Sequence, residues 1–215
     1  MGRLTVGLDC CLALALALVM SLSRPSVALD PRFPDWPCQQ LKVPEISIAS
    51  VWSGPPIGAV DSSKPGDPRE ADLVPRLAAR RTPIETAQQL IKDYLTGTAA
   101  ERQQRATSLF AALYATLNAQ RGQVMNGIER FSRKQKMMAE QIRANAQKIR
   151  EIQDRPDADP AQNEALASEL SWQTRIFDDR RKTTSYVCEV PVLIEKRLFD
   201  LSKAIQDALK AEPAK

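Results

Sequence analysis

The sequence contains no histidine among its 215 residues, and aromatic residues make up only 5% of it. Without histidine the chain has no Ser-His-Asp or Cys-His relay, no histidine metal ligand and no imidazole that titrates near neutral pH. Most familiar hydrolase and metalloenzyme mechanisms are therefore excluded, and we expect no enzyme activity, no metal site and no cofactor. The 43% of hydrophobic and 26% of charged residues are ordinary for a folded protein.

The amino terminus has the pattern of a secretion signal. Arg3 precedes an apolar run over residues 10–22, and Ser26-Val27-Ala28 places small residues where a signal peptidase cleaves. The alternative is a retained anchor helix, but about 13 apolar residues are too few to span a bilayer. We therefore expect a signal peptide over residues 1–28, cleaved near Ala28, and a periplasmic mature chain with no transmembrane segment.

Removal of residues 1–28 leaves 28 basic and 25 acidic residues. The resulting net charge of +3 is small for a protein that binds nucleic acid, so we expect no nucleic-acid partner.

Cleavage also removes Cys10 and Cys11, so the mature chain keeps only Cys38 and Cys188. Two cysteines in an oxidising compartment predict one disulfide, which would close a loop of about 150 residues. A reactive thiol pair and a two-thiolate metal site are the alternatives. Neither cysteine belongs to a Cys-x-x-Cys motif and no third ligand completes a metal shell, so the disulfide is the favoured interpretation.

Residues 29–70 are rich in proline, which excludes a long helix there and predicts an extended arm. The arm nevertheless carries apolar side chains that a solvated linker would lack: Phe33, Trp36, Val43, Ile46, Ile48, Val51 and Trp52. We therefore expect it to lie in a groove on the rest of the protein, with residues 59–70 forming a loop.

The remainder, residues 71–215, reads as one helical domain. Short helices are predicted over residues 71–80 and 83–96, the second opened by a capping box from Thr82 to Glu85. Residues 98–155 contain no proline and only two glycines, which predicts one long helix of roughly 55 residues.

A return helix is predicted over residues 160–210, with Asp159 as its N-cap and Pro160 at its first position. Stripe residues recur at alternating intervals of three and four along the return helix and along the distal half of the long helix, as in coiled coils. The prediction is an all-α fold: a long antiparallel helical hairpin with two shorter basal helices and the extended arm. The distal part, residues 130–182, should project as a finger.

The short turn sets the register, because facing residues should have numbers that sum to about 316. Ile128 then faces Cys188, and the polar Gln135 faces Arg180 or Arg181. We interpret this last pairing as a polar layer that fixes the register rather than as a binding site.

The same register places Gly122 and Gly127 beside Cys188 and Pro191. A glycine within a helix is costly and usually has a packing reason. We therefore expect the arm to enter here, with Trp36 or Trp52 packed over the two glycines.

Residues 121–155 carry 9 basic residues against 4 acidic ones. This basic face is the strongest functional signal in the sequence. The alternative is a solvated surface partly neutralised by acidic residues on the facing helix: Glu164, Glu169, Asp178 and Asp179. The candidate basic residues are Arg130, Arg133, Lys134, Lys136, Arg143, Lys148 and Arg150.

Three segments resemble a group of uncharacterised secreted proteins of Gram-negative, alphaproteobacterial bacteria. They are Asp35-Trp36-Pro37-Cys38, Val51-Trp52-Ser53-Gly54-Pro55-Pro56 and Tyr186-Val187-Cys188-Glu189-Val190-Pro191-Val192. The resemblance implies a periplasmic location and brings no activity, site or cofactor with it.

Together these patterns predict a periplasmic interaction or scaffold protein, whose finger docks a partner protein of unknown identity. The alternative is an envelope-surface or chaperone-like module, whose basic face at residues 121–155 meets an anionic envelope surface or an unfolded client. The apolar stripe can be covered within the chain or by a second copy, and the sequence leaves a homo-oligomer open.

Overall fold

The computed structural model describes residues 30–57 and 67–211. The predicted signal at residues 1–28 and most of the predicted loop therefore lie outside the described residues. The chain divides into two units at Pro34, and in the first of them Asp30 and Arg32 form an ion pair. All that follows concerns the second unit, from Asp35 onward.

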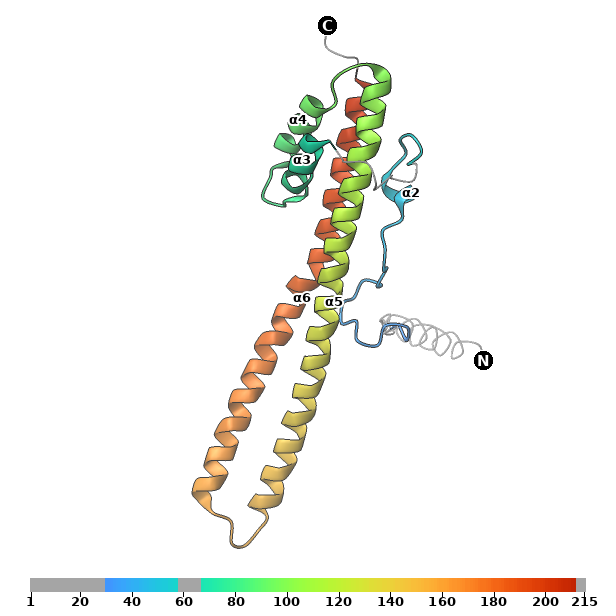
Figure 1. The fold of residues 1–215 in the computed structure, drawn as a ribbon. Helices are drawn as coiled ribbons and strands as arrows, with labels where there is room; N and C mark the ends of the chain where they lie inside the picture. The colour runs from blue at the N-terminus through green and yellow to red at the C-terminus, as the bar shows by residue number, and fades with distance from the viewer. Residues whose placement is uncertain (1–29, 58–66, 212–215) are drawn as a thin grey trace, which may run out of the picture. The chain divides into compact units, whose positions relative to one another are not determined.

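The fold is all-α over the described residues, as predicted (Figure 1). Its helices are α2 (Ile48–Val51), α3 (Pro68–Ala78), α4 (Ile84–Tyr94), α5 (Ala99–Gln153) and α6 (Pro160–Lys210). The two long helices have nearly the predicted bounds, because strong signals mark the turn between them. At the start of α6, the Asp159 carboxylate accepts a hydrogen bond from the Ala161 N–H, and Pro160 occupies the first turn.

Contacts across the hairpin confirm the predicted register. Arg121 bonds Glu195 at 2.6 Å, and the side chains of Asn145 and Gln173 bond each other at 3.0 Å. Both pairs have numbers that sum to within two of the predicted value. The antiparallel pairing therefore follows from the position of the turn.

The short helices depart from prediction at their starts. Helix α3 begins at Pro68 rather than residue 71, because the Asp67 side chain caps it by accepting from the Arg69 N–H. The proposed cap of α4 is wrong: the Thr82 hydroxyl donates to the Arg76 carbonyl instead, and the N-cap is Pro83.

The complete capping box lies at the start of α5 and was missed from the sequence. The Thr98 side chain accepts from the Glu101 N–H, while the Glu101 carboxylate accepts from the Thr98 N–H. The signal, Thr98-x-x-Glu101, is present in the sequence just after Gly97.

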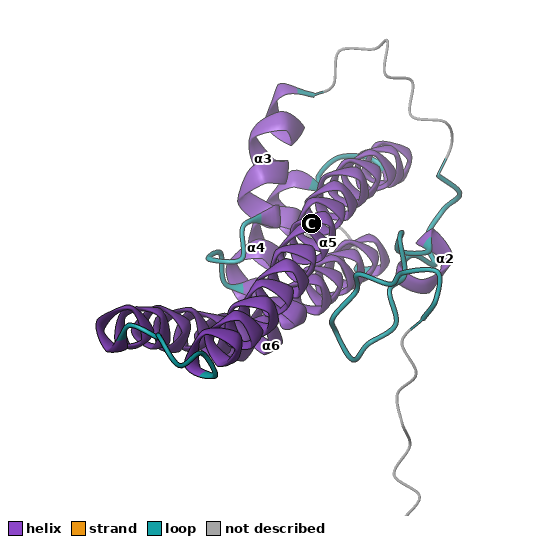
Figure 2. Cartoon of the chain, turned by 90° about the horizontal axis from the view of Figure 1, so that it is seen from below, coloured by secondary structure: helices purple, strands orange, loops and turns teal. Residues whose placement is uncertain are grey.

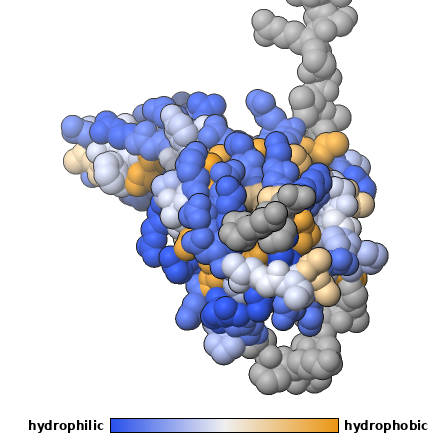
Figure 3. Space-filling view, turned by 90° about the horizontal axis from the view of Figure 1, so that it is seen from above, coloured by the Kyte–Doolittle hydropathy of each residue, from blue (hydrophilic) through white to orange (hydrophobic). Residues whose placement is uncertain are grey.

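Helices α3 and α4 pack against the basal half of the hairpin and form a body with one hydrophobic core (Figure 2). Leu77, Ile91, Phe110, Leu198 and Ile205 are completely buried there. Seen from above, the body presents a largely hydrophilic surface with apolar groups showing between polar ones (Figure 3). On this face, polar side chains therefore surround the apolar groups.

The arm, residues 35–57, lies in a groove of the body as predicted, although one helical turn, α2, interrupts its extended course. Ile46 and Trp52 belong to the hydrophobic core. The arm runs along one side of the hairpin, and α3 and α4 occupy other positions around it (Figure 2). Several layers therefore cover the seam between α5 and α6 in the body.

The finger, residues 130–182, is different. Its two helices continue beyond the body (Figure 1), and only Ser132 and Ile149 are buried among its residues. The other stripe residues, such as Met138, Ile142 and Phe177, are half-buried. A pair of helices alone leaves the edges of its seam open to solvent, and that is the state of the finger.

Candidate functional site

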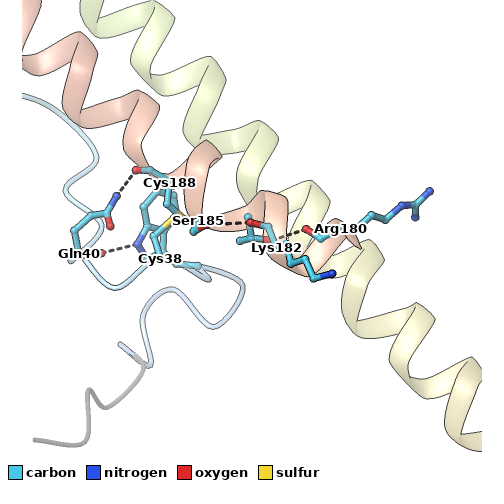
Figure 4. Close-up of a disulfide and its surroundings, with 8 residues drawn as sticks. Cys38, Gln40, Arg180, Lys182, Ser185 and Cys188 are labelled. Atoms are coloured by element: carbon cyan, nitrogen blue, oxygen red, sulfur yellow. Dashed lines mark hydrogen bonds between the residues drawn. A yellow bond between two sulfur atoms is a disulfide. The ribbon is translucent and has the colours of Figure 1, made fainter. Parts of the chain in front are cut away.

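A disulfide fastens the arm to the hairpin where body and finger meet. Cys38 and Cys188 are bonded, with their Cα atoms 5.5 Å apart, as predicted (Figure 4). Gln40 donates from its Nε2 to the Cys188 carbonyl, and the Trp36 indole donates to the Gln40 carbonyl at 2.7 Å. Pro191 lies inside α6 one turn after this segment, and because it lacks an N–H it cannot donate to the Val187 carbonyl.

The predicted packing of Trp36 or Trp52 over two glycines is wrong. A Cβ added at Gly122 would meet nothing within 4 Å, and one at Gly127 would meet only the Arg130 guanidinium. Trp52 instead stacks on Phe110, with ring centroids 4.2 Å apart.

The glycines therefore do not form the arm's groove. Gly122 faces open space, and both glycines are half-buried. The arm contacts other residues of the two long helices.

Arg121 is the main polar anchor of the arm. Its side chain is only 4% exposed, and it donates to the carbonyls of Val43 at 2.7 Å and Pro44 at 3.3 Å as well as to Glu195. A buried guanidinium needs several acceptors, and the arm supplies two of them. Arg121 is thus part of the interior and not of the basic surface on which its charge was counted.

Other side chains satisfy the backbone of the arm in the same way. The Tyr114 hydroxyl donates to the Ile46 carbonyl at 2.7 Å, Asn118 accepts from the Ile46 N–H at 3.2 Å, and Ser202 donates to the Val51 carbonyl. An extended segment outside a sheet must find such partners when it is buried. Sequence reasoning missed these residues, since single polar residues in a helical stripe resemble solvated positions.

A cavity of about 720 Å³ lies beside the disulfide, between the first residues of the arm and the start of the finger. Its lining combines apolar, uncharged polar and charged groups: Pro37, Cys38, Gln39, Gln40, Ser132, Gln135, Phe177, Arg181, Thr184, Ser185, Cys188, Glu189, Val192 and Leu193. A concave surface of this size and mixed chemistry is typical of binding sites.

Gln135, predicted as part of a polar layer, lines this cavity together with Arg181. Its Nε2 donates to the Phe177 carbonyl at 3.3 Å, which fixes the orientation of the amide because a carbonyl can only accept. The Oε1 atom is buried and has no hydrogen-bond partner within the described chain. Buried polar atoms without a partner are uncommon and point to an incomplete environment.

A second, shallower hollow of about 510 Å³ lies farther along the finger on α6. It is lined by Ala167, Leu170, Ser171, Thr174, Arg175, Asp178, Asp179 and Lys182. Both hollows are therefore lined in part or entirely by residues of the finger, which is the predicted docking region.

The arm neutralises part of the basic face. Asp35 pairs with Lys136 at 3.0 Å and Arg133 at 3.1 Å, and Lys42 pairs with Glu129 at 2.6 Å. Hydrogen bonds from Lys136 and then Arg133 hold the pKa of Asp35 below its ordinary value. The two basic residues are exposed, so each pair is worth little by itself.

The alternative interpretation, in which acidic residues of α6 neutralise the basic face of α5, is wrong for two of these acidic residues. Asp178 pairs with Arg181 and Asp179 with Lys182, both within α6. The candidate basic residues on α5 are all exposed: Arg130, Arg133, Lys134, Lys136, Arg143, Lys148 and Arg150.

Comparison with known protein families, curated proteins and solved structures finds no match for this chain.

Within residues 30–57 and 67–211, no three acidic or cysteine side chains gather as metal ligands, and no helix is long and apolar enough to cross a membrane. The finger offers a partly uncovered helical seam, two hollows lined by its residues and a row of basic groups. These features suit the binding of another polypeptide.

Proposed function

We propose that this protein is a periplasmic scaffold that docks a partner protein on its finger. The secretion pattern of residues 1–28 and the Cys38–Cys188 bond support an oxidising compartment outside the cytoplasm. The body holds the arm and the short helices, while the finger extends beyond them.

The observation that carries this proposal is the contrast between the two halves of one seam. In the body, the stripe residues Leu113, Leu117 and Leu198 are at most 1% exposed, because the arm and short helices cover them. In the finger, equivalent residues such as Met138 and Phe177 stay half-buried. A docked polypeptide would bury this apolar area, and each Å² buried would stabilise the complex by about 25 cal/mol.

Chemical cross-linking and pull-down from a periplasmic extract test the proposal. We expect the native chain to capture a specific protein, and a variant with residues 134–178 replaced by a short turn to lose it. The core of the body lies outside the deleted segment, so the variant should keep its disulfide and its helical circular dichroism. Capture of the same proteins by both chains would contradict the proposal.

A second candidate function is binding to an anionic envelope surface. The exposed row of basic residues on α5 favours it, because such a row attracts anionic lipid or lipopolysaccharide. Binding to vesicles that contain anionic lipid should then fall steeply as the salt concentration rises. Vesicle binding that is unchanged by salt would exclude this electrostatic mechanism.

A further inference from the structure

We propose that the groove filled by the arm continues onto the finger, and that this distal part binds an extended, acidic segment of the partner protein. The inference rests on the proposed docking function and identifies the chemistry of the docked segment. It is carried by three rows of residues that begin at the arm and continue past it.

The first row lies on α6 at intervals of seven residues, which place side chains on one side of a coiled-coil helix. Ser202 donates to the Val51 carbonyl, Glu195 accepts from the arm's anchor Arg121, and Cys188 is bonded to Cys38. The same row then continues as Arg181, Thr174 and Ala167. These three residues are exposed and line the two hollows.

The second row lies on α5 with the same spacing. It starts at Asn118, which accepts from the Ile46 N–H under the arm, and passes through Met125 to Ser132 in the cavity wall. It continues as Ala139 and Ala146, which are half-buried. Small side chains at these positions leave room for another chain, as the cavity beside Ser132 already does.

A third row, also on α5, supplies charge. Glu129 pairs with Lys42 of the arm, and seven residues later Lys136 pairs with Asp35. The next two members are Arg143 and Arg150, which are exposed and form no ion pair within the described chain. The arm's own Asp35 thus shows how a carboxylate sits on this row, and a further segment should place carboxylates on the two arginines.

The spacing of the row predicts the pattern of that segment. Seven helical residues rise by about 10 Å, which an extended chain of polyproline II geometry covers in roughly three residues, one full turn, so that every third side chain points the same way. Acidic residues three positions apart, with apolar residues between them, would therefore follow Arg143 and Arg150 while filling the small-residue row. Near the cavity, Ser132 and Gln135 place polar side chains in the wall beside such a chain.

A labelled synthetic peptide tests this inference on the full native chain. The probe is an extended peptide of roughly ten residues with Asp at every third position and Val between. We expect it to bind the native chain, and the same peptide with Lys in place of Asp to bind much more weakly. Replacing both arginines, R143E with R150E, should weaken binding of the acidic peptide about tenfold, since two attractions become repulsions.

The matched control is K134E with K148E, which reverses two charges on the same helix about half a turn away. This control should change acidic-peptide binding less than twofold, because it leaves the proposed row intact. Equal losses from both double reversals, or equal binding of the acidic and basic peptides, would overturn the inference. A dimer in sedimentation that dissociates on R143E with R150E would assign the groove to a second copy and overturn it as well.

The docking proposal and the acidic-segment inference can be refuted independently of each other. If deletion of residues 134–178 abolishes capture of a partner while R143E with R150E does not, docking stands and the acidic-segment inference falls. If the deletion changes nothing, the docking proposal itself falls.

Discussion

Removal of the disulfide is expected to lower the free energy of unfolding by roughly 4–5 kcal/mol. The bond joins residues 150 apart, and a cross-link of that span removes considerable entropy from the unfolded chain. Urea unfolding of the native chain and of the double variant Cys38→Ala with Cys188→Ala, both without reductant, measures the difference. Both cysteines are 92% buried, and alanine fits the space of either one without introducing a polar group.

Native protein treated with reductant is the control for this experiment. Its free energy of unfolding should fall to nearly that of the double variant, because the bond rather than the side chains carries the effect. A loss below about 1 kcal/mol would contradict the expectation, because it would mean that contacts remaining in the unfolded chain already restrict it without the bond. Those contacts, at Arg121, Tyr114 and Trp52, should keep the distant part of the arm docked in the double variant.

Phe110→Ala is expected to lower the free energy of unfolding by roughly 4 kcal/mol, because truncating a completely buried phenylalanine leaves a cavity. Phe110 also lies against Trp52 of the arm at 4.2 Å and near Tyr114 at 6.2 Å. Aromatic pairs of this kind contribute about 0.5–1.5 kcal/mol of stability beyond what the burial of their surface area contributes. The substitution should therefore damage the core and release the arm near Trp52 together.

Phe199→Ala is the matched control, since Phe199 is 50% exposed on α6. It should change the free energy of unfolding by less than about 1 kcal/mol. Tryptophan fluorescence, measured with Trp36 and Trp172 replaced by phenylalanine, reports on Trp52 alone. Equal losses from the two alanine variants, or an unchanged Trp52 signal in Phe110→Ala, would mean that the arm does not depend on this stack.

The hairpin could be predicted because its signals are local and repeated. The absence of proline from residues 98–155 predicts the length of the first long helix, and the three-four spacing of the second predicts its partner. Asp159-Pro160 marks the turn between them. Once the turn is known, the register follows, and with it the position of Cys188 relative to α5. The disulfide followed from the compartment and the count of cysteines.

The course of the arm could not be predicted in detail, because its contacts depend on residues without a pattern of their own. Gly122 and Gly127 suggested an opening by their lack of side chains, yet the arm passes over Tyr114, Asn118 and Arg121. These residues bind backbone groups, and any extended segment offers such groups regardless of its sequence. A charged residue such as Arg121 in the helix pattern could equally have been a surface position.

The basic face illustrates the same limit from another direction. Its residues are exposed, and the sequence suggested, as the alternative to a functional role, that acidic residues of the facing helix neutralise them in part. The structure pairs Lys136 and Arg133 with Asp35 of the arm instead, which lies about 100 residues away in the chain. Long-range pairing of this kind follows from where the disulfide holds the arm, and that position appears only in three dimensions.

The body covers its own seam, and we infer that the finger leaves its seam open for a partner. Hydrogen exchange of the native chain alone, followed by mass spectrometry, measures this difference between body and finger. We expect amides of residues 105–128 and 190–208 to exchange with protection close to that of global unfolding. Amides of residues 134–178 should exchange at least about a hundredfold faster. Uniform protection along the whole length of α5 and α6 would contradict the claim.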